Sequence, residues 1–99
     1  MLVHTVIFWL KENLTEDQRA IFSDEVNTLG EIGSVESFHF GAPAPTPKRP
    51  VVEDSYDCAI TVILKDMAAH DDYLADPILL AFVDKCKDMW ERVVIYDAD

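Results

Sequence analysis

The first apolar segment of the chain is apolar on both sides. Residues 2–11, LVHTVIFWLK, are rich in β-branched and aromatic residues, as is typical of a β-strand. Both alternating faces are largely apolar, and His4 is the polar exception on one of them. Because such a strand must be covered on both faces, the pattern predicts helices of this chain on one side. The other side needs a further sheet.

A helix is predicted over residues 15–30. The letters TEDQ at 15–18 fit a capping box with Thr15 as N-cap and Gln18 three residues later. Glycines at 30 and 33 end the segment. The apolar residues expected on one face of this helix are Ile21, Phe22, Val26 and Leu29.

Two strands are predicted in the middle of the chain, at 34–41 and 55–65, because both segments alternate apolar and polar residues. Between them lies APAPTPKRPVVED, which holds four of the five prolines of the chain. Proline removes amide donors and stiffens the backbone, so this segment is predicted to be a long loop.

The last third predicts a broken helix and a final strand. Asp66 can cap a short helix over 67–75, and Asp76-Pro77 restarts the helix because Asp caps and Pro suits the first turn. The fourth strand is predicted at 92–97. Helical spacing places these residues on one face of the second helical segment: Leu79, Phe82, Val83, Cys86 and Trp90.

The predicted order is β-α-β-β-α-β, which is the ferredoxin-like α+β arrangement: a four-stranded antiparallel sheet with helices on one face. A chain of 99 residues is expected to form one domain over 1–99. Left bare, the second face would be a large apolar patch, so we expect a homodimer in which two sheets enclose a barrel. Alternation assigns to this face Ile7, Trp9, Phe38, Phe40, Ile63, Val93 and Ile95.

Charge and composition exclude several classes of function. The net charge of −11 disfavours binding to nucleic acid and to anionic membranes. No apolar run approaches a membrane span, and the N-terminus lacks the pattern of a signal peptide, so a cytoplasmic protein is expected. The two cysteines, Cys58 and Cys86, lie in apolar patterns and are expected to be buried and reduced.

Several motifs together resemble the Dabb family of stress-responsive dimeric α/β-barrel domains. They are MLVHTVIFWLK at the start, GAPAP after the second strand, SYDCAITVIL in the third strand and DYLADPILLAFVDKCKDMWERVVIYD at the end. The resemblance spans nearly the whole chain. It implies a dimer with a pocket between each sheet and its own helices.

Some plant members of that family resemble polyketide cyclases, which close a poly-β-keto chain by aldol condensation. In those cyclases a His of the second helix is the base, a Tyr one to two turns earlier assists it, and a His of the first strand lines the pocket. The resemblance maps the strand His onto His4 and the Tyr onto Tyr73. The base position falls on Leu79, which cannot accept a proton, and Asp76 and Cys58 replace two further histidines.

Two functions from different classes remain open. In the first, the chain is a stress-associated module that binds a small hydrophobic or carbonyl-containing metabolite without catalysis. In the second, it is a small cyclase, lyase or isomerase acting on a β-keto or phenolic substrate, with His4 as base and Tyr73 polarising the carbonyl. Simple core packing of His4 and Tyr73 is the alternative to both. The other predicted pocket residues are Phe8, Cys58, Leu79, Phe82 and Trp90.

The remaining histidines give no metal motif. His39 alternates with Phe38 and Phe40 and is expected on the face shared with Val35 and Ser37, and a position in the pocket stays open. His70, beside Asp71 and Asp72, is expected in solvent. No HxH, HxxxH or HxxE spacing occurs at any histidine. We therefore expect no metal site and no cofactor.

Overall fold

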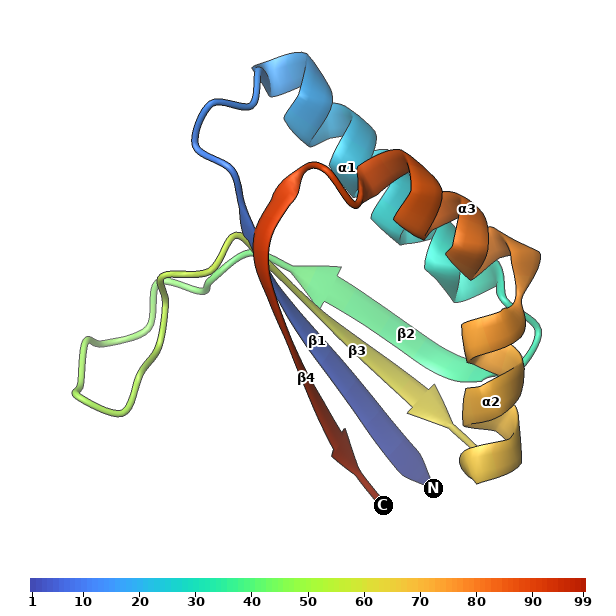
Figure 1. The fold of residues 1–99 in the computed structure, drawn as a ribbon. Coiled ribbons are helices and arrows are strands. Elements are labelled where there is room, and N and C mark those ends of the chain that lie inside the picture. Colours follow the sequence, from blue (N-terminus) through green and yellow to red (C-terminus); the bar gives the residue numbers. More distant parts are fainter.

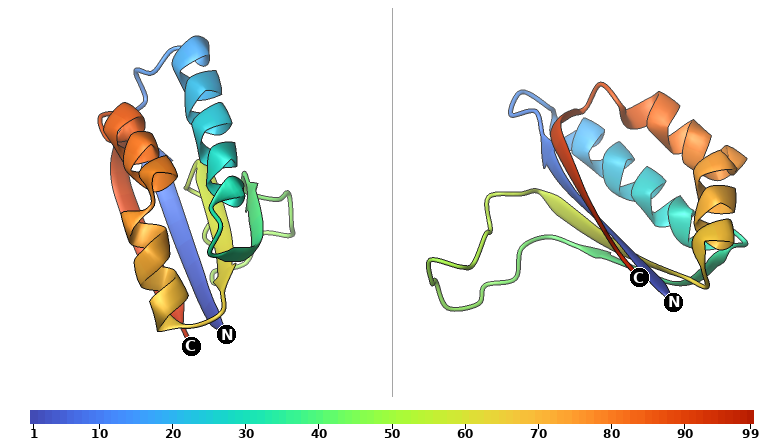
Figure 2. Two further views of the ribbon diagram at one scale, coloured as in Figure 1. Left: turned by 90° about the vertical axis from the view of Figure 1, so that its right-hand side faces the viewer. Right: turned by 60° about the horizontal axis from the view of Figure 1, so that its bottom comes forward.

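The computed structural model describes all residues from 1 to 99. It has two layers, a β-sheet and a layer of helices packed on one of its faces (Figure 1). The sheet is antiparallel and has the strand order β2-β3-β1-β4. Figure 2 shows all the helices on the same face of this sheet, so the predicted ferredoxin-like α+β fold is confirmed. The elements are β1 (Leu2–Leu10), α1 (Glu16–Thr28), a 3-10 turn η1 (Leu29–Glu31), β2 (Val35–Gly41), β3 (Cys58–Leu64), α2 (Met67–Ala75), α3 (Pro77–Cys86) and β4 (Trp90–Ala98).

The helix boundaries follow local capping rules. Thr15 and Gln18 form the predicted capping box at the start of α1. The Asp66 carboxylate accepts from the amide of Ala69 and caps α2. The Asp76 carboxylate accepts from the amide of Ile78, 2.8 Å away, and Pro77 occupies the first turn of α3. The chain therefore bends between α2 and α3 at the junction that the sequence indicates.

In the two central strands, β1 and β3, successive side chains alternate between the two faces of the sheet. On β1 the even-numbered residues are buried beneath the helices, and the odd-numbered residues are half-buried on the other face. β3 shows the same alternation. Fifteen apolar side chains form the core between sheet and helices, with contributions from every element except β2 and β4: Leu2, Val6, Phe8, Leu10, Phe22, Val26, Leu29, Ile32, Cys58, Ile60, Val62, Leu64, Tyr73, Phe82 and Cys86.

The prediction for the second face of the sheet was wrong for both edge strands. Four of its members turn toward the helices, because the register pairs each of them with an inward residue of the neighbouring strand. These pairs are Phe38 with Val62, Phe40 with Ile60, Val93 with Phe8 and Ile95 with Val6. Alternation tells which residues share a face, but only the register tells which face is covered.

Two element boundaries also differ from the prediction. β3 begins at Cys58, three residues later than expected. Trp90 was predicted as the last apolar position of the second helical segment, but α3 ends at Cys86 and Trp90 is the first residue of β4. The amide of Met89 donates to the carbonyl of Cys86, which closes the turn between helix and strand. Trp90 therefore reaches the core from the sheet.

The face of the sheet away from the helices carries aromatic and aliphatic side chains. The indole of Trp9 donates to the hydroxyl of Ser55, 3.0 Å away, and the guanidinium of Arg92 lies 4.5 Å from its ring centroid. Ser55 belongs to the segment between β2 and β3, which extends beyond the sheet (Figure 1). A cavity of about 190 Å³ on this face is lined by Ile7, Trp9, Glu53, Tyr56 and Tyr96.

None of the helices is long and apolar enough to cross a membrane.

Candidate functional site

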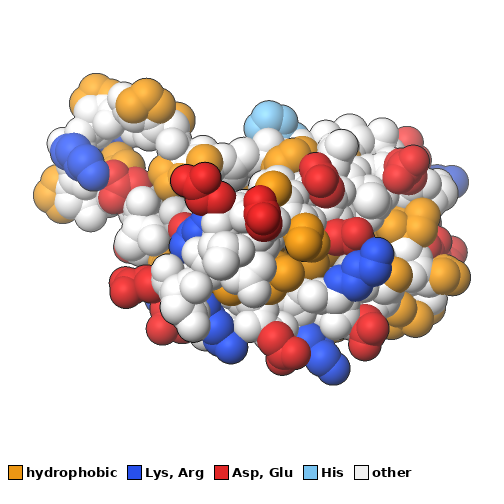
Figure 3. Space-filling view, turned by 90° about the horizontal axis from the view of Figure 1, so that it is seen from above, with side chains coloured by type: hydrophobic (Ala, Val, Ile, Leu, Met, Phe, Trp, Pro, Cys, Tyr) orange, Lys and Arg blue, Asp and Glu red, His pale blue; other side chains and the backbone are white.

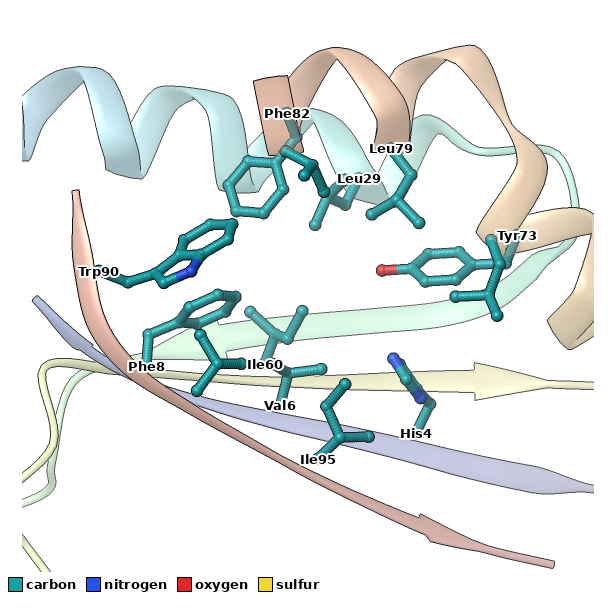
Figure 4. A pocket seen from close by; sticks show the side chains of 13 residues that line it. His4, Val6, Phe8, Leu29, Ile60, Tyr73, Leu79, Phe82, Trp90 and Ile95 are labelled. Carbon is teal, nitrogen blue, oxygen red and sulfur yellow. The ribbon is translucent and has the colours of Figure 1, made fainter. Parts of the chain in front are cut away.

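A cavity of about 190 Å³ lies between the sheet and the helices α2 and α3 (Figure 4). Twelve of the thirteen residues that line it are hydrophobic, and His4 is the exception. The sheet contributes mostly β1 and β4 to the floor, so the cavity lies toward the β4 edge. The lining residues are His4, Val6, Phe8, Ile60, Trp90, Val93 and Ile95 from the sheet and Leu29, Tyr73, Leu74, Leu79, Phe82 and Val83 from the helical side.

The cavity opens to solvent through an apolar mouth. Three of its lining residues are well exposed: Leu74 at 46%, Val83 at 38% and Ile95 at 53%. Seen from above, apolar side chains gather at the end of the molecule that carries α2, between scattered acidic groups (Figure 3). An apolar molecule therefore has a path from solvent into the cavity.

The Tyr73 side chain directs its hydroxyl into this apolar space (Figure 4). Its side chain is 1% exposed, and in Figure 4 the hydroxyl points along the cavity. This hydroxyl makes no hydrogen bond within the protein, and it is reachable from the cavity, because the Ser34 hydroxyl is the only fully buried side-chain polar atom without a partner. Burial alone raises the pKa of the Tyr73 phenol to about 12, so the hydroxyl stays protonated over the neutral range. It is therefore a free hydrogen-bond donor for a molecule in the cavity.

His4 belongs to β1, and its ring centroid lies 5.5 Å from that of Tyr73 on α2. Both side chains line the same cavity, as Figure 4 shows. The Nδ1 atom of His4 is joined by a hydrogen bond to the carboxylate of Asp97 on β4. This bond arises because the register pairs residues 4 and 97 across adjacent strands. A carboxylate on Nδ1 fixes the orientation of the ring and leaves Nε2 for other partners.

Asp97 and His70 are polar neighbours of the cavity that the sequence did not reveal. The prediction that His70 faces solvent was wrong: its side chain is only 13% exposed, and its ring centroid lies 5.4 Å from that of His4. His70 precedes Tyr73 by three residues, so both lie on the inner face of α2. The inward spacing shared with Tyr73 was the available signal, and the neighbouring aspartates obscured it.

These polar groups converge although no linear motif unites them. One ligand atom from each of His4, His70 and Asp97 lies within 4.8 Å of the others. The three residues come from β1, α2 and β4 and are separated by up to 93 positions. Spacing rules detect ligands on a single element, so they do not detect a group assembled from three elements.

The opposite end of the cavity is aromatic. The ring centroid of Phe8 lies 5.3 Å from that of Trp90 and 6.0 Å from that of Phe82. Leu79 lines the cavity between the two ends. Its side chain cannot act as an acid or a base. The site is therefore polar at the end formed by α2 and apolar over the rest of its length.

Two candidates lie outside the cavity. Cys58 is a core residue that does not line it, because the cavity lies toward β4 and takes only Ile60 from β3. Burial, and secondarily the charge of Asp57, raise the pKa of the Cys58 thiol to about 11, which disfavours a nucleophilic thiolate. His39 pairs with Thr61 on the outer face of the sheet and is exposed.

Relatives with the same fold include enzymes. The chain is 23% identical to olivetolic acid cyclase of Cannabis sativa over 95 residues, which cover 95% of this chain and 91% of that protein. The hydroxynitrile lyase of Passiflora edulis superposes with a TM-score of 0.81 at 17% identity, covering 98% of this chain and 90% of that one. A dimeric ferredoxin-like protein of unknown function from Thermobifida fusca superposes with a TM-score of 0.80 at 19% identity, covering 98% and 88%.

The family is identified by sequence over almost the full length. The model of the Stress responsive A/B Barrel Domain, abbreviated Dabb, matches residues 2–99. The match includes every strand and helix described above. The chain therefore belongs to the stress-responsive A/B barrel domain family.

Proposed function

We propose that this chain binds a small, largely apolar carbonyl compound in the cavity between sheet and helices, with the carbonyl oxygen at Tyr73. The observation that carries the proposal is the Tyr73 hydroxyl, which faces an apolar cavity (Figure 4) and makes no hydrogen bond within the protein. Because this hydroxyl has no acceptor in the protein, it can donate a hydrogen bond to a molecule held in the cavity. A ligand that supplies an acceptor would complete this hydrogen bond.

The shape and lining of the cavity support an aryl or alkyl ketone. A volume of about 190 Å³ suits a compound with one aromatic ring, and the rings of Phe8, Phe82 and Trp90 form an aromatic surface for it. The only polar partners lie at the other end. A ligand with one apolar end and one carbonyl therefore matches the site better than a sugar, a nucleotide or an ion pair would.

The first prediction compares phenyl alkyl ketones with alkylbenzenes of matched size. We expect the wild-type protein to prefer the ketone, because a net hydrogen bond contributes about 0.5–1.5 kcal/mol, or roughly 2- to 12-fold in affinity. Tyr73→Phe should bind both compounds equally, since it keeps the ring and removes the donor. Isothermal titration calorimetry in the presence of EDTA measures both affinities.

The titration tests both the position of the carbonyl group and the cavity as the ligand site. An unchanged preference in Tyr73→Phe would show that the carbonyl is bound elsewhere. Absence of binding for the whole ketone series would refute the cavity as a ligand site. Leu80→Phe is a suitable control, because Leu80 is 57% exposed on α3 and is not a lining residue.

An enzymatic function on the same class of compound is the second candidate, and the bond between His4 and Asp97 favours it. An imidazole held by a carboxylate, next to a free phenol, has the arrangement needed to abstract a proton beside a carbonyl group. His4 would take the α-proton, and Tyr73 would donate a hydrogen bond to the developing enolate oxygen. The cyclase and the lyase among the relatives are compatible with this candidate.

The second prediction concerns proton exchange. In D₂O with EDTA, the wild-type protein should accelerate exchange of the α-protons of a bound phenyl alkyl ketone, as followed by NMR. His4→Gln should lose about 10²-fold or more of this rate, as expected for removal of a general base. Asp97→Asn should lower the rate less, because it leaves the imidazole in place. Exchange at the uncatalysed rate in the wild-type protein, under conditions where the ketone is bound, would reject the enzymatic candidate.

A homodimer is part of the proposal. The outer sheet face presents Ile7, Trp9 and Ile63 as half-buried side chains, and Tyr96 is 65% exposed. A second copy of the sheet would cover this apolar surface. The dimeric state of the Thermobifida fusca relative supports the same assembly.

A further inference from the structure

The polar end of the cavity contains two imidazoles and a carboxylate from three different elements. His4 is 3% exposed on β1, His70 lies on α2 with a side chain 13% exposed, and Asp97 lies on β4 with a side chain 43% exposed. One ligand atom from each of the three lies within 4.8 Å of the others. The protein therefore brings two nitrogen donors and one oxygen donor together at the edge of an apolar space.

Coordination chemistry indicates which ion this set would take. Two imidazoles and one carboxylate suit divalent transition metals such as Zn²⁺, Co²⁺ and Fe²⁺, whereas Ca²⁺ and Mg²⁺ prefer oxygen ligands. Donors about 2.0–2.2 Å from a tetrahedral ion stand about 3.4 Å from one another. Binding therefore requires the wider pairs of donors to close by roughly an ångström and Asp97 to move, so that the ion replaces its hydrogen bond to Nδ1 of His4. Asp97 has the freedom to do so, because it is partly exposed near the end of its strand.

The surroundings also favour a cation. The Oδ1 atom of Asp71 lies 3.4 Å from Nδ1 of His70, so this carboxylate can hold the ring and leave Nε2 free. A carboxylate behind a ligating histidine is a common outer-shell arrangement at metal sites. The chain carries a net charge of −11, which adds a long-range attraction for cations.

A second, independent feature points to a bound group at this position. Tyr73 is 1% exposed, its hydroxyl makes no hydrogen bond within the protein, and its ring lies 5.5 Å from that of His4. Three protein ligands leave at least one coordination position of a tetrahedral ion open. The cavity adjoins His4, so an open position can face the space into which the Tyr73 hydroxyl points (Figure 4).

We propose that His4, His70 and Asp97 form a binding site for one divalent transition-metal ion per chain, with an open coordination position facing the cavity. An ion held there would coordinate an oxygen of the ligand, such as a carbonyl or an enolate. The site itself needs no organic ligand. The inference thus goes beyond the proposed function and can succeed or fail independently of it.

Titration of the metal-free protein with Co²⁺ tests the site directly. We expect one Co²⁺ per chain with visible absorption bands typical of nitrogen and oxygen ligands, and Zn²⁺ should displace it. His70→Ala and Asp97→Asn should each weaken Co²⁺ binding by at least 100-fold. His39→Ala is the matched control, because His39 is exposed on the opposite face of the sheet, and it should bind Co²⁺ like the wild-type protein.

Three results would overturn the proposal. One is absence of Co²⁺ and Zn²⁺ binding at millimolar concentration in the folded wild-type protein. Another is unchanged affinity in both His70→Ala and Asp97→Asn, with circular dichroism showing that both are folded. The third is a sulfur-to-cobalt charge-transfer band, which would assign the ion to Cys58 or Cys86. Ketone titrations in EDTA remain a separate measurement, so failure of the metal site and failure of the ligand site are distinguishable.

Discussion

Replacing Phe8 with alanine should lower the free energy of unfolding by about 3–5 kcal/mol, the range for large aromatic side chains deleted from a core. Phe8 is 3% exposed in the C-terminal half of β1, and its ring lies 5.3 Å from Phe22 and 5.3 Å from Trp90. The substitution removes buried apolar surface and three ring contacts at once, two of which are edge-to-face. Urea denaturation at fixed protein concentration measures the change, since the stability of a dimer depends on concentration.

The matched control is Leu80→Ala, which removes an apolar side chain that is 57% exposed on α3. Its effect should stay within about 0.5 kcal/mol, as for most surface substitutions. A loss of less than about 1.5 kcal/mol in Phe8→Ala would contradict the expectation. It would mean that the aromatic end of the cavity is loosely packed and collapses into the space left by the ring.

The fold could be predicted because its elements obey local rules. The capping box at Thr15, the cap at Asp66 and the Asp76-Pro77 junction each depend on residues within a few positions of one another. The central strands could be predicted because they are rich in apolar residues that favour β-strands. The faces of β2 and β4 could not, because they depend on register. A register shift between Val35 and Ser37 also breaks the alternation of β2.

The candidate site was predictable only in part, for a similar reason. His4 can be identified from its own segment, because it is a polar residue in an apolar strand. Tyr73 is indicated by the family resemblance. Asp97 is noticeable only when β4 is paired with β1 in the observed register, 93 residues away. Once Val93 and Ile95 are known to face the helices, strand alternation places Asp97 on the same side. The missing information was therefore long-range pairing rather than residue chemistry.

The second large effect is expected at the proposed dimer interface. Ile7 lies at the centre of the outer sheet face, where Ala59 and Val94 are its cross-strand neighbours. Ile7→Asp should weaken the dimer by more than about 100-fold, or about 2.7 kcal/mol, because the interface would bury two carboxylates without partners. Trp9→Asp is a less decisive choice, since Arg92 lies over Trp9 and can neutralise a carboxylate there. Sedimentation velocity or light scattering at micromolar concentration measures the mass.

Leu80→Asp provides the control, because it introduces the same charge on an exposed position of α3, away from the outer sheet face. It should leave the mass of the dimer unchanged. A monomeric wild-type protein would refute the homodimer, and a dimeric Ile7→Asp variant would place the interface elsewhere. Circular dichroism distinguishes dissociation from unfolding, since Ile7 is not a member of the core between sheet and helices and a folded monomer should persist. The cavity lies on the other side of the sheet, so that monomer should still bind the ketone.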